Sequence, residues 1–196
     1  SQMTEGDLLG LPKVDDNVTK WLAPEWLDTA CKNPVVLFLD EVDRATLEVR
    51  QGIFELCDSR KIAGHSLHPD TLIFACVNGG QHGSEYQVNE FDPAELDRYT
   101  VFDVEPTVED WLAWAEGNVA NEIWDFINHN HNHLEHKDTF EPNKIYPSRR
   151  SWERLSDTLS QVGSIKHGTT LYHLAHAFIG FEGAMAFNDY VKNYCK

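Results

Sequence analysis

The sequence lacks the features that mark a membrane-spanning or disulfide-rich secreted protein. No stretch approaches the roughly 18 consecutive apolar residues that a membrane-spanning helix needs, and residues 1–7 are polar, unlike a signal peptide. The 4 cysteines show no Cys-x-x-Cys spacing, which argues against a zinc site or a disulfide framework. We therefore expect a cytoplasmic protein without a membrane partner and with reduced cysteines, of which Cys57 and Cys76 lie in apolar runs typical of a core.

Basic residues are also scarce. Lys and Arg total 16 against 32 Asp and Glu, so the formal net charge is −16. A field of that sign repels phosphate backbones, so nucleic acid is not expected as the main partner. The 196 residues, 41% of them hydrophobic, suffice for one domain with its own core or for a medium domain with a small companion.

The hydrophobic pattern divides the chain near residue 105. Before that point, short apolar runs alternate with segments of helical spacing, which is typical of an α/β fold with a parallel sheet. The predicted strands are 35–39, 71–77 and 100–104, and the predicted helices are 21–31, 44–59 and 93–98. Residues 60–70 are predicted to form a hairpin, and residues 4–20 an irregular insertion.

After residue 105 only helical patterns occur. Thr107 is a good N-cap for a first helix, Pro147-Ser148 opens another, and residues 169–194 are predicted to be helical with a break near Gly180. A polar, His-rich connection lies between the first two. The sequence thus predicts an α/β domain over 1–105 and an all-helical domain over 106–196.

The first predicted strand ends in two acids, Asp40 and Glu41. A buried parallel strand delivers such side chains to the carboxyl edge of the sheet, where Mg²⁺ and phosphates collect. The pattern resembles a Walker B segment, in which Asp40 would hold Mg²⁺ through water and Glu41 would polarise the attacking water. The alternative is a strand end that carries two solvated acids.

Three further segments follow in order. The next strand ends at Asn78, then comes Leu96-Asp97-Arg98-Tyr99, and then Pro147-Ser148-Arg149-Arg150-Ser151-Trp152. Together with the two acids they resemble the MoxR branch of the AAA+ ATPases. The resemblance implies that Asn78 is the sensor 1 residue that contacts the γ-phosphate, that Arg98 is the arginine finger, and that residues 147–152 begin the sensor 2 helix of the lid. Taken singly, Asn78 before two glycines is also typical of a turn, and Arg98 also of a surface pair with Asp97.

The resemblance implies ATP and Mg²⁺ as cofactors and a homo-oligomeric ring, a hexamer, in which Arg98 acts on the neighbouring subunit. The activity implied is ATP hydrolysis that remodels or activates a protein client. Phage and bacterial ATPases related to those that work with von Willebrand A-domain partners are the most similar group. Residues 4–16 and 60–70 resemble the pore-facing helix 2 insert and pre-sensor 1 hairpin, so Leu8, Leu9 and Leu11 are expected to face a client.

Two adjacent arginines compete for the sensor 2 role. Neighbouring helix residues point roughly 100° apart, so only one of Arg149 and Arg150 should face the nucleotide. The Arg-Ser-Trp match favours Arg150. In the same family Asn stands where this chain has Asp43, two residues after Glu41.

A P-loop, the G-x-x-x-x-G-K-[ST] phosphate cradle, does not occur in these residues. Without its backbone N–H groups and Lys we expect the chain by itself not to hydrolyse ATP, and we expect an upstream segment, a rearranged strand or another chain to supply it. One rival interpretation is a non-catalytic AAA+-derived interaction scaffold. Another is a metal-binding helical adaptor that uses the histidines between His129 and His136, although a solvated connector is the simpler interpretation.

Overall fold

The computed structural model describes residues 3–78, 91, 93–163 and 168–194, and they form a mixed α/β structure. The chain divides into two compact units, Ser1–Phe102 and Asp103–Lys196. The first contains every described strand, and the second contains helices only. No helix in the described ranges is both long and apolar enough to cross a bilayer.

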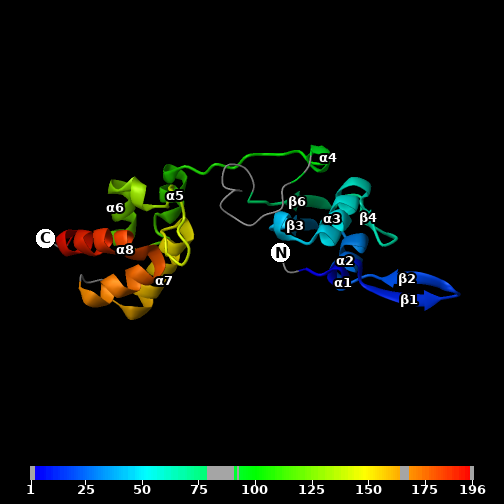
Figure 1. Cartoon of the computed structure of the whole chain (residues 1–196), viewed down its shortest axis with the longest axis horizontal. Helices are drawn as coiled ribbons and strands as arrows, with labels where there is room; N and C mark the ends of the chain where they lie inside the picture. Colours follow the sequence, from blue (N-terminus) through cyan, green and yellow to red (C-terminus); the bar gives the residue numbers. More distant parts are fainter. Residues whose placement is uncertain (1–2, 79–90, 92, 164–167, 195–196) are drawn as a thin grey trace. The chain divides into compact units, whose positions relative to one another are not determined.

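The first unit combines short strands with helices (Figure 1). Its elements in chain order are α1 (Glu5–Leu9), β1 (Leu11–Asp15), β2 (Val18–Leu22), α2 (Glu25–Lys32), β3 (Val36–Leu39), the 3₁₀ turn η1 (Val42–Arg44), α3 (Leu47–Ser59), β4 (Lys61–Ile62), β5 (His65–Ser66), β6 (Leu72–Ala75) and α4 (Pro93–Leu96). The strands at 35–39 and 71–77, the hairpin within 60–70 and the helices at 21–31, 44–59 and 93–98 were all predicted, with ends that differ by a few residues.

A parallel pair of strands, β3 and β6, lies at the centre of this unit. Val36 pairs with Leu72 at one end of the ladder, and Leu39 pairs with Ala75 at the other. The connection between them runs through α3 and the β4–β5 hairpin, as a parallel crossover requires. Both strands therefore end at the same edge of the sheet.

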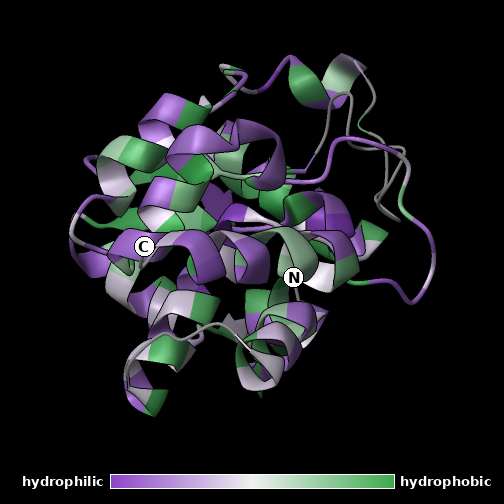
Figure 2. Ribbon diagram, turned by 90° about the vertical axis from the view of Figure 1, so that its left-hand side faces the viewer, coloured by the Kyte–Doolittle hydropathy of each residue, from purple (hydrophilic) through white to green (hydrophobic). Residues whose placement is uncertain are grey.

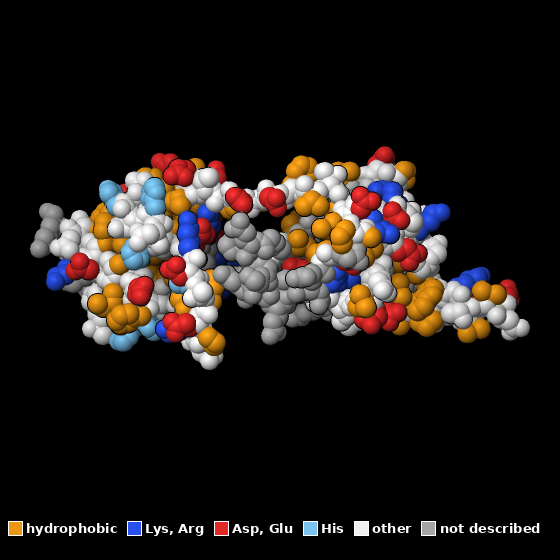
Figure 3. Space-filling view, turned by 45° about the horizontal axis from the view of Figure 1, so that its top comes forward, with side chains coloured by type: hydrophobic (Ala, Val, Ile, Leu, Met, Phe, Trp, Pro, Cys, Tyr) orange, Lys and Arg blue, Asp and Glu red, His pale blue; other side chains and the backbone are white. Residues whose placement is uncertain are grey.

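One face of this parallel pair is covered and the other is not. Leu37, Leu39 and Ile73 pack against the buried core formed with α1, α2 and α3. The opposite face carries four exposed apolar side chains, Val36, Phe38, Leu72 and Phe74. The prediction that these strands are buried on both faces was therefore wrong for this face, because no element in the described part of the chain packs on it. Hydrophobic side chains gather on the surface of this unit in Figure 3.

The predicted third strand at 100–104 does not form. The segment is irregular, and Val101, Phe102 and Val104 are exposed, Phe102 by 79%. A strand is stable only when its backbone groups pair with a neighbour, and no described strand pairs with this one. The apolar, β-branched composition predicts a strand correctly only where a partner is present.

The segment at 4–20 is regular, which corrects the expectation of an irregular insertion. Thr4 caps α1 through a capping box with Asp7. The antiparallel hairpin β1–β2 follows, and its turn residues Asp16 and Asn17 have φ of 48° and 61°, the left-handed values that a tight hairpin turn needs. Because both faces of this hairpin are largely exposed, its apolar residues show no inside–outside alternation in the sequence.

Leu8 belongs to the core. It is 1% exposed and lies so close to Gly52 of α3 that a Cβ at Gly52 would come within 2.6 Å of its Cδ2. Leu11, three residues later, is 69% exposed. The expectation that Leu8 faces a client was therefore wrong, whereas Leu11 lies on the exposed hairpin.

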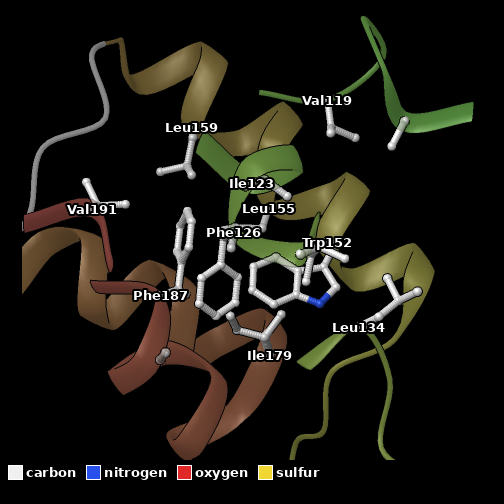
Figure 4. Close-up of a cluster of buried hydrophobic side chains, with 14 of the residues drawn as sticks. Val119, Ile123, Phe126, Leu134, Trp152, Leu155, Leu159, Ile179, Phe187 and Val191 are labelled. Atoms are coloured by element: carbon white, nitrogen blue, oxygen red, sulfur yellow. The ribbon is translucent and has the colours of Figure 1, made fainter. Parts of the chain in front are cut away.

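The second unit is built from α5 (Val108–Ala115), α6 (Asn121–His129), the 3₁₀ turn η3 (His131–His133), α7 (Arg149–Val162) and α8 (Thr169–Tyr194). Thr107 and Ser148 cap α5 and α7 through capping boxes. The helices alternate hydrophilic and hydrophobic stretches (Figure 2) and bury a core in which Phe126, Trp152 and Phe187 lie together (Figure 4).

Gly180 breaks α8, as predicted. Its φ is 73°, a left-handed value at which a side chain is strained. A Cβ there would also lie 2.0 Å from the carbonyl oxygen of Ile145. The chain therefore needs glycine at this position, both for the kink and for the close approach of the 145–146 backbone.

We expect Leu8→Ala to lower the free energy of unfolding by about 2–5 kcal/mol, because it leaves a cavity in the core. The matched substitution Leu11→Ala should change it by no more than about 0.5 kcal/mol, since that side chain is already in water. Urea denaturation of both variants measures the difference. Equal, small effects would contradict the placement of Leu8 in the core.

Candidate active site at the carboxyl edge of the parallel strands

The structure brings Asp40, Glu41 and Asn78 to one edge of the sheet. The ladder of β3 and β6 continues past the strand ends, because the N–H of Cys76 donates to the carbonyl of Leu39 at 2.8 Å. The N–H of Val42 then donates to the carbonyl of Cys76 at 3.3 Å. The two acids follow β3 directly, and Asn78 lies on the chain leaving β6, so the same edge carries all three.

The two acids differ in their surroundings. Asp40 is exposed, so its carboxylate is available to a hydrated cation. Glu41 is half-buried and has left-handed backbone angles, φ 54° and ψ 43°. A non-glycine residue pays about 1–3 kcal/mol for such a conformation, and such residues cluster at functional sites. Its carboxylate lies 3.2 Å from the guanidinium of Arg44.

Asp43 is a site residue that the sequence did not reveal. It is 1% exposed, and its Oδ2 accepts a hydrogen bond of 2.9 Å from the backbone N–H of Asn78. The sequence showed Asp43 only as a substitution for the Asn of the resembled family. An acid four residues after a strand carries no local signal of a bond to the segment that leaves another strand.

A buried ion pair anchors the segment that carries Arg98. Arg50 of α3 pairs with Glu95 of α4 at 2.8 Å and lies over the ring of Phe91, 4.6 Å from its centroid. Arg98 itself is exposed, and its guanidinium donates to the carbonyl of Ala94 in the same segment. The structure thus presents Arg98 at the surface and gives it no contact with Asp40 or Glu41.

The aromatic residues around this anchor are closely packed. Phe54 makes edge-to-face contacts with the rings of Phe91 and Tyr99. Burial raises the pKa of the Tyr99 phenol, and the adjacent Cys57 thiol raises it further. Burial also raises the pKa of Cys57, which makes that thiol a poor nucleophile. Cys76, predicted to be a core cysteine, is exposed instead, because it lies just past the end of β6.

In the helical unit, the two candidate arginines have separate environments. Arg149 contacts both carboxylate oxygens of Glu135, at 3.0 and 3.2 Å, and donates to the carbonyls of Pro106 and Thr107. Arg150 is exposed and makes no hydrogen bond or ion pair to any residue that the structure describes. Arg149 is therefore engaged in holding the start of α5 against α7, and Arg150 is the one available to a ligand.

Three of the histidines at 129–136 contact other parts of the helical unit. His129 contacts the carbonyl of Asp125 at 2.7 Å through its Nδ1, and His136 stacks on Tyr146 with ring centroids 4.0 Å apart. His133 packs on the ring of Phe126, and burial lowers its pKa. Across the described ranges, no three His, Cys, Asp or Glu residues are grouped to hold a metal ion. A lone Asp40 still suits Mg²⁺, which keeps several waters and takes substrate phosphates as ligands.

No protein-family model, curated protein or solved structure matches this chain.

Arg50→Ala should lower the free energy of unfolding by about 3–5 kcal/mol, because it removes the buried guanidinium of a largely buried ion pair, together with its contact to the ring of Phe91. Lys20→Ala, which removes an exposed ion pair with Asp15 in the hairpin, is the matched control. It should cost no more than about 1 kcal/mol. Urea denaturation compares the two, and an equally small effect of Arg50→Ala would show that this pair does not anchor α4.

Arg149→Ala should lower the free energy of unfolding of the helical unit by about 2 kcal/mol. The substitution removes the hydrogen bonds that the charged guanidinium makes to Glu135 and to two backbone carbonyls. Arg150→Ala should leave stability within about 0.5 kcal/mol. Calorimetry of the two single variants distinguishes them. A larger loss of stability in Arg150→Ala than in Arg149→Ala would show that Arg150, not Arg149, holds α5 against α7.

Proposed function

We propose that this chain is part of a MoxR-type AAA+ ATPase that hydrolyses ATP and uses the energy to remodel or activate a protein partner. One observation carries the proposal. The parallel register of β3 and β6 places two acids and an asparagine at the carboxyl edge of the sheet, the edge where α/β folds bind nucleotides.

Each residue has a stated task in this reaction. Asp40, exposed beside the sheet edge, would hold Mg²⁺ through water, and the metal would neutralise phosphate charge. Glu41 would orient the attacking water, for which its carboxylate must leave the guanidinium of Arg44. Asn78 would donate an amide hydrogen bond to the γ-phosphate. The ion pair of Glu41 with Arg44 is thus the contact that has to change before hydrolysis.

By family resemblance, two arginines would complete the site. Arg98, exposed on a segment anchored by the buried Arg50–Glu95 pair, would reach the nucleotide of a neighbouring subunit in a homo-oligomeric ring, a hexamer in the resembled family. Arg150 would reach it from the helical lid, because Arg149 is already engaged with Glu135.

The phosphate cradle has to come from outside these residues. Parallel sheets are normally covered on both faces, yet one face of β3 and β6 exposes Val36, Phe38, Leu72 and Phe74. Segment 100–104 is apolar, exposed and unpaired with any described strand. A strand leading into a Walker A loop would pair beside β6, and the helix after the loop would cover this face. We propose that an upstream segment or another chain supplies them.

The exposed hairpin β1–β2 is the proposed contact for the client. It carries Leu11, Val14 and Val18 on its surface, held at its base by a 2.9 Å contact of His65 Nε2 with the carbonyl of Trp21. A von Willebrand A-domain protein is the proposed kind of partner, by family resemblance. The cytoplasm is the proposed location, because the cysteines show no disulfide framework.

A non-catalytic scaffold is the second candidate. It is favoured by the missing Walker A segment and by the pairing of Glu41 with Arg44. The two functions differ in hydrolysis alone, so an activity measurement in the assembled protein separates them.

In the assembled ATPase, Glu41→Gln should bind ATP but hydrolyse it at least about a hundredfold more slowly, since it cannot orient water as a carboxylate does.

Arg98→Ala should lower the rate of ATP hydrolysis by about 10³-fold or more. Mixing the two inactive proteins should restore some activity, because some interfaces then join an intact Arg98 to an intact Glu41. Steady-state phosphate release measures all three. Failure of every mixture to recover would contradict a role of Arg98 across subunits, and no hydrolysis by the wild type would favour the scaffold.

A further inference from the structure

Beyond the ends of β3 and β6, one further hydrogen bond joins the two segments, and its acceptor is a side chain. After the backbone bonds from Cys76 to Leu39 and from Val42 to Cys76, the next bond runs from the N–H of Asn78 to Oδ2 of Asp43. The carboxylate takes the place of a strand carbonyl, because η1 has already turned the backbone away.

The carboxylate end of this connection is buried, whereas Asn78 is exposed. Asp43 is 1% exposed, and its second oxygen, Oδ1, has no hydrogen-bond partner among the residues that the structure describes. Hydrogen bonds to a charged acceptor are roughly twice as strong as neutral ones, whereas an unpaired buried oxygen is costly. A chain that only needed stability would do better with an apolar residue in this place.

We infer that Asp43 is a positioning residue that fixes the backbone of Asn78 relative to the turn that carries Glu41. The inference rests on the proposed function and deepens it. Glu41 begins η1 and Asp43 lies within it, so one rigid turn sets both the carboxylate that orients water and, through Asp43, the residue that contacts the γ-phosphate. Without this bond, Asn78 would remain attached to β6 but no longer be held to the Glu41 turn.

Amide hydrogen exchange, followed by NMR on the 196-residue chain, tests the geometry without any nucleotide. The Asn78 amide should be protected in the wild type. In Asp43→Ala it should exchange at least about tenfold faster, the loss expected for a charged hydrogen bond. The Val42 amide, whose acceptor is the backbone of Cys76, should keep its protection and serves as the internal reference.

Two further variants keep this experiment decisive. Asp43→Asn retains an acceptor without charge, so Asn78 should exchange severalfold faster than in the wild type but more slowly than in Asp43→Ala. If Asp43→Ala does not fold, the comparison of Asp43→Asn with the wild type is sufficient by itself.

Ser156→Ala is the matched control. Ser156 is another buried side chain that accepts a hydrogen bond from a backbone N–H, in this case that of Ala120 at 2.8 Å. It should expose Ala120 and leave Asn78 unchanged. An unprotected Asn78 in the wild type, or protection unaffected by both Asp43 variants, overturns the inference.

Kinetics of the assembled ATPase test the consequence. Asp43→Ala should lower kcat at least about tenfold with KM for ATP changed by less than about threefold, Asp43→Asn should recover most of the rate, and Ser156→Ala should leave kcat unchanged. Loss of Asn78 protection with an unchanged kcat overturns the positioning role alone. If the wild type never hydrolyses ATP, the proposed function is wrong. The hydrogen-exchange experiment still tests the bond between Asp43 and Asn78 in that case, because it needs no nucleotide.

Discussion

The parallel pairing of β3 with β6 is the constraint on which the rest of the candidate site depends. Parallel strands in register end at one edge, so the pairing brings Asp40 and Glu41 to the same edge of the sheet as Asn78. Backbone hydrogen bonds continue this pairing as far as Val42. The chemistry proposed for these residues follows from their types, but their proximity follows from the ladder alone.

Buried charges fix the parts that the ladder does not reach. Arg50 and Glu95 tie α4, and with it the segment of Arg98, to the helix that follows the acids. Asp43 ties Asn78 to the turn after β3. Such interactions add little net stability, because desolvation offsets most of their electrostatic gain. Their directional geometry is what they contribute, and this suits a site in which phosphate and water contacts have to be placed within fractions of an ångström.

The uncovered face of the parallel pair links the fold to the proposed function. Four apolar side chains on that face and three in the 100–104 segment remain in water, although their composition is that of buried strands. The same region is where the resembled family places its phosphate-binding strand and helix. Under the proposed function, the additional segment that supplies the Walker A motif would also cover this exposed apolar surface.

The sequence by itself determined the cap at Thr107 and the break at Gly180, because capping hydrogen bonds and left-handed φ values depend on neighbouring residues. Short apolar runs marked both central strands, but whether such a run forms a strand depended on a pairing partner, which the run at 100–104 lacks among the described strands. The tertiary structure decided everything that depends on what packs against what. It buried Leu8, left one face of the central strands in water, and engaged Arg149 rather than Arg150 with Glu135. Burial and pairing across the fold bring together residues far apart in the chain, and no local pattern specifies which ones meet.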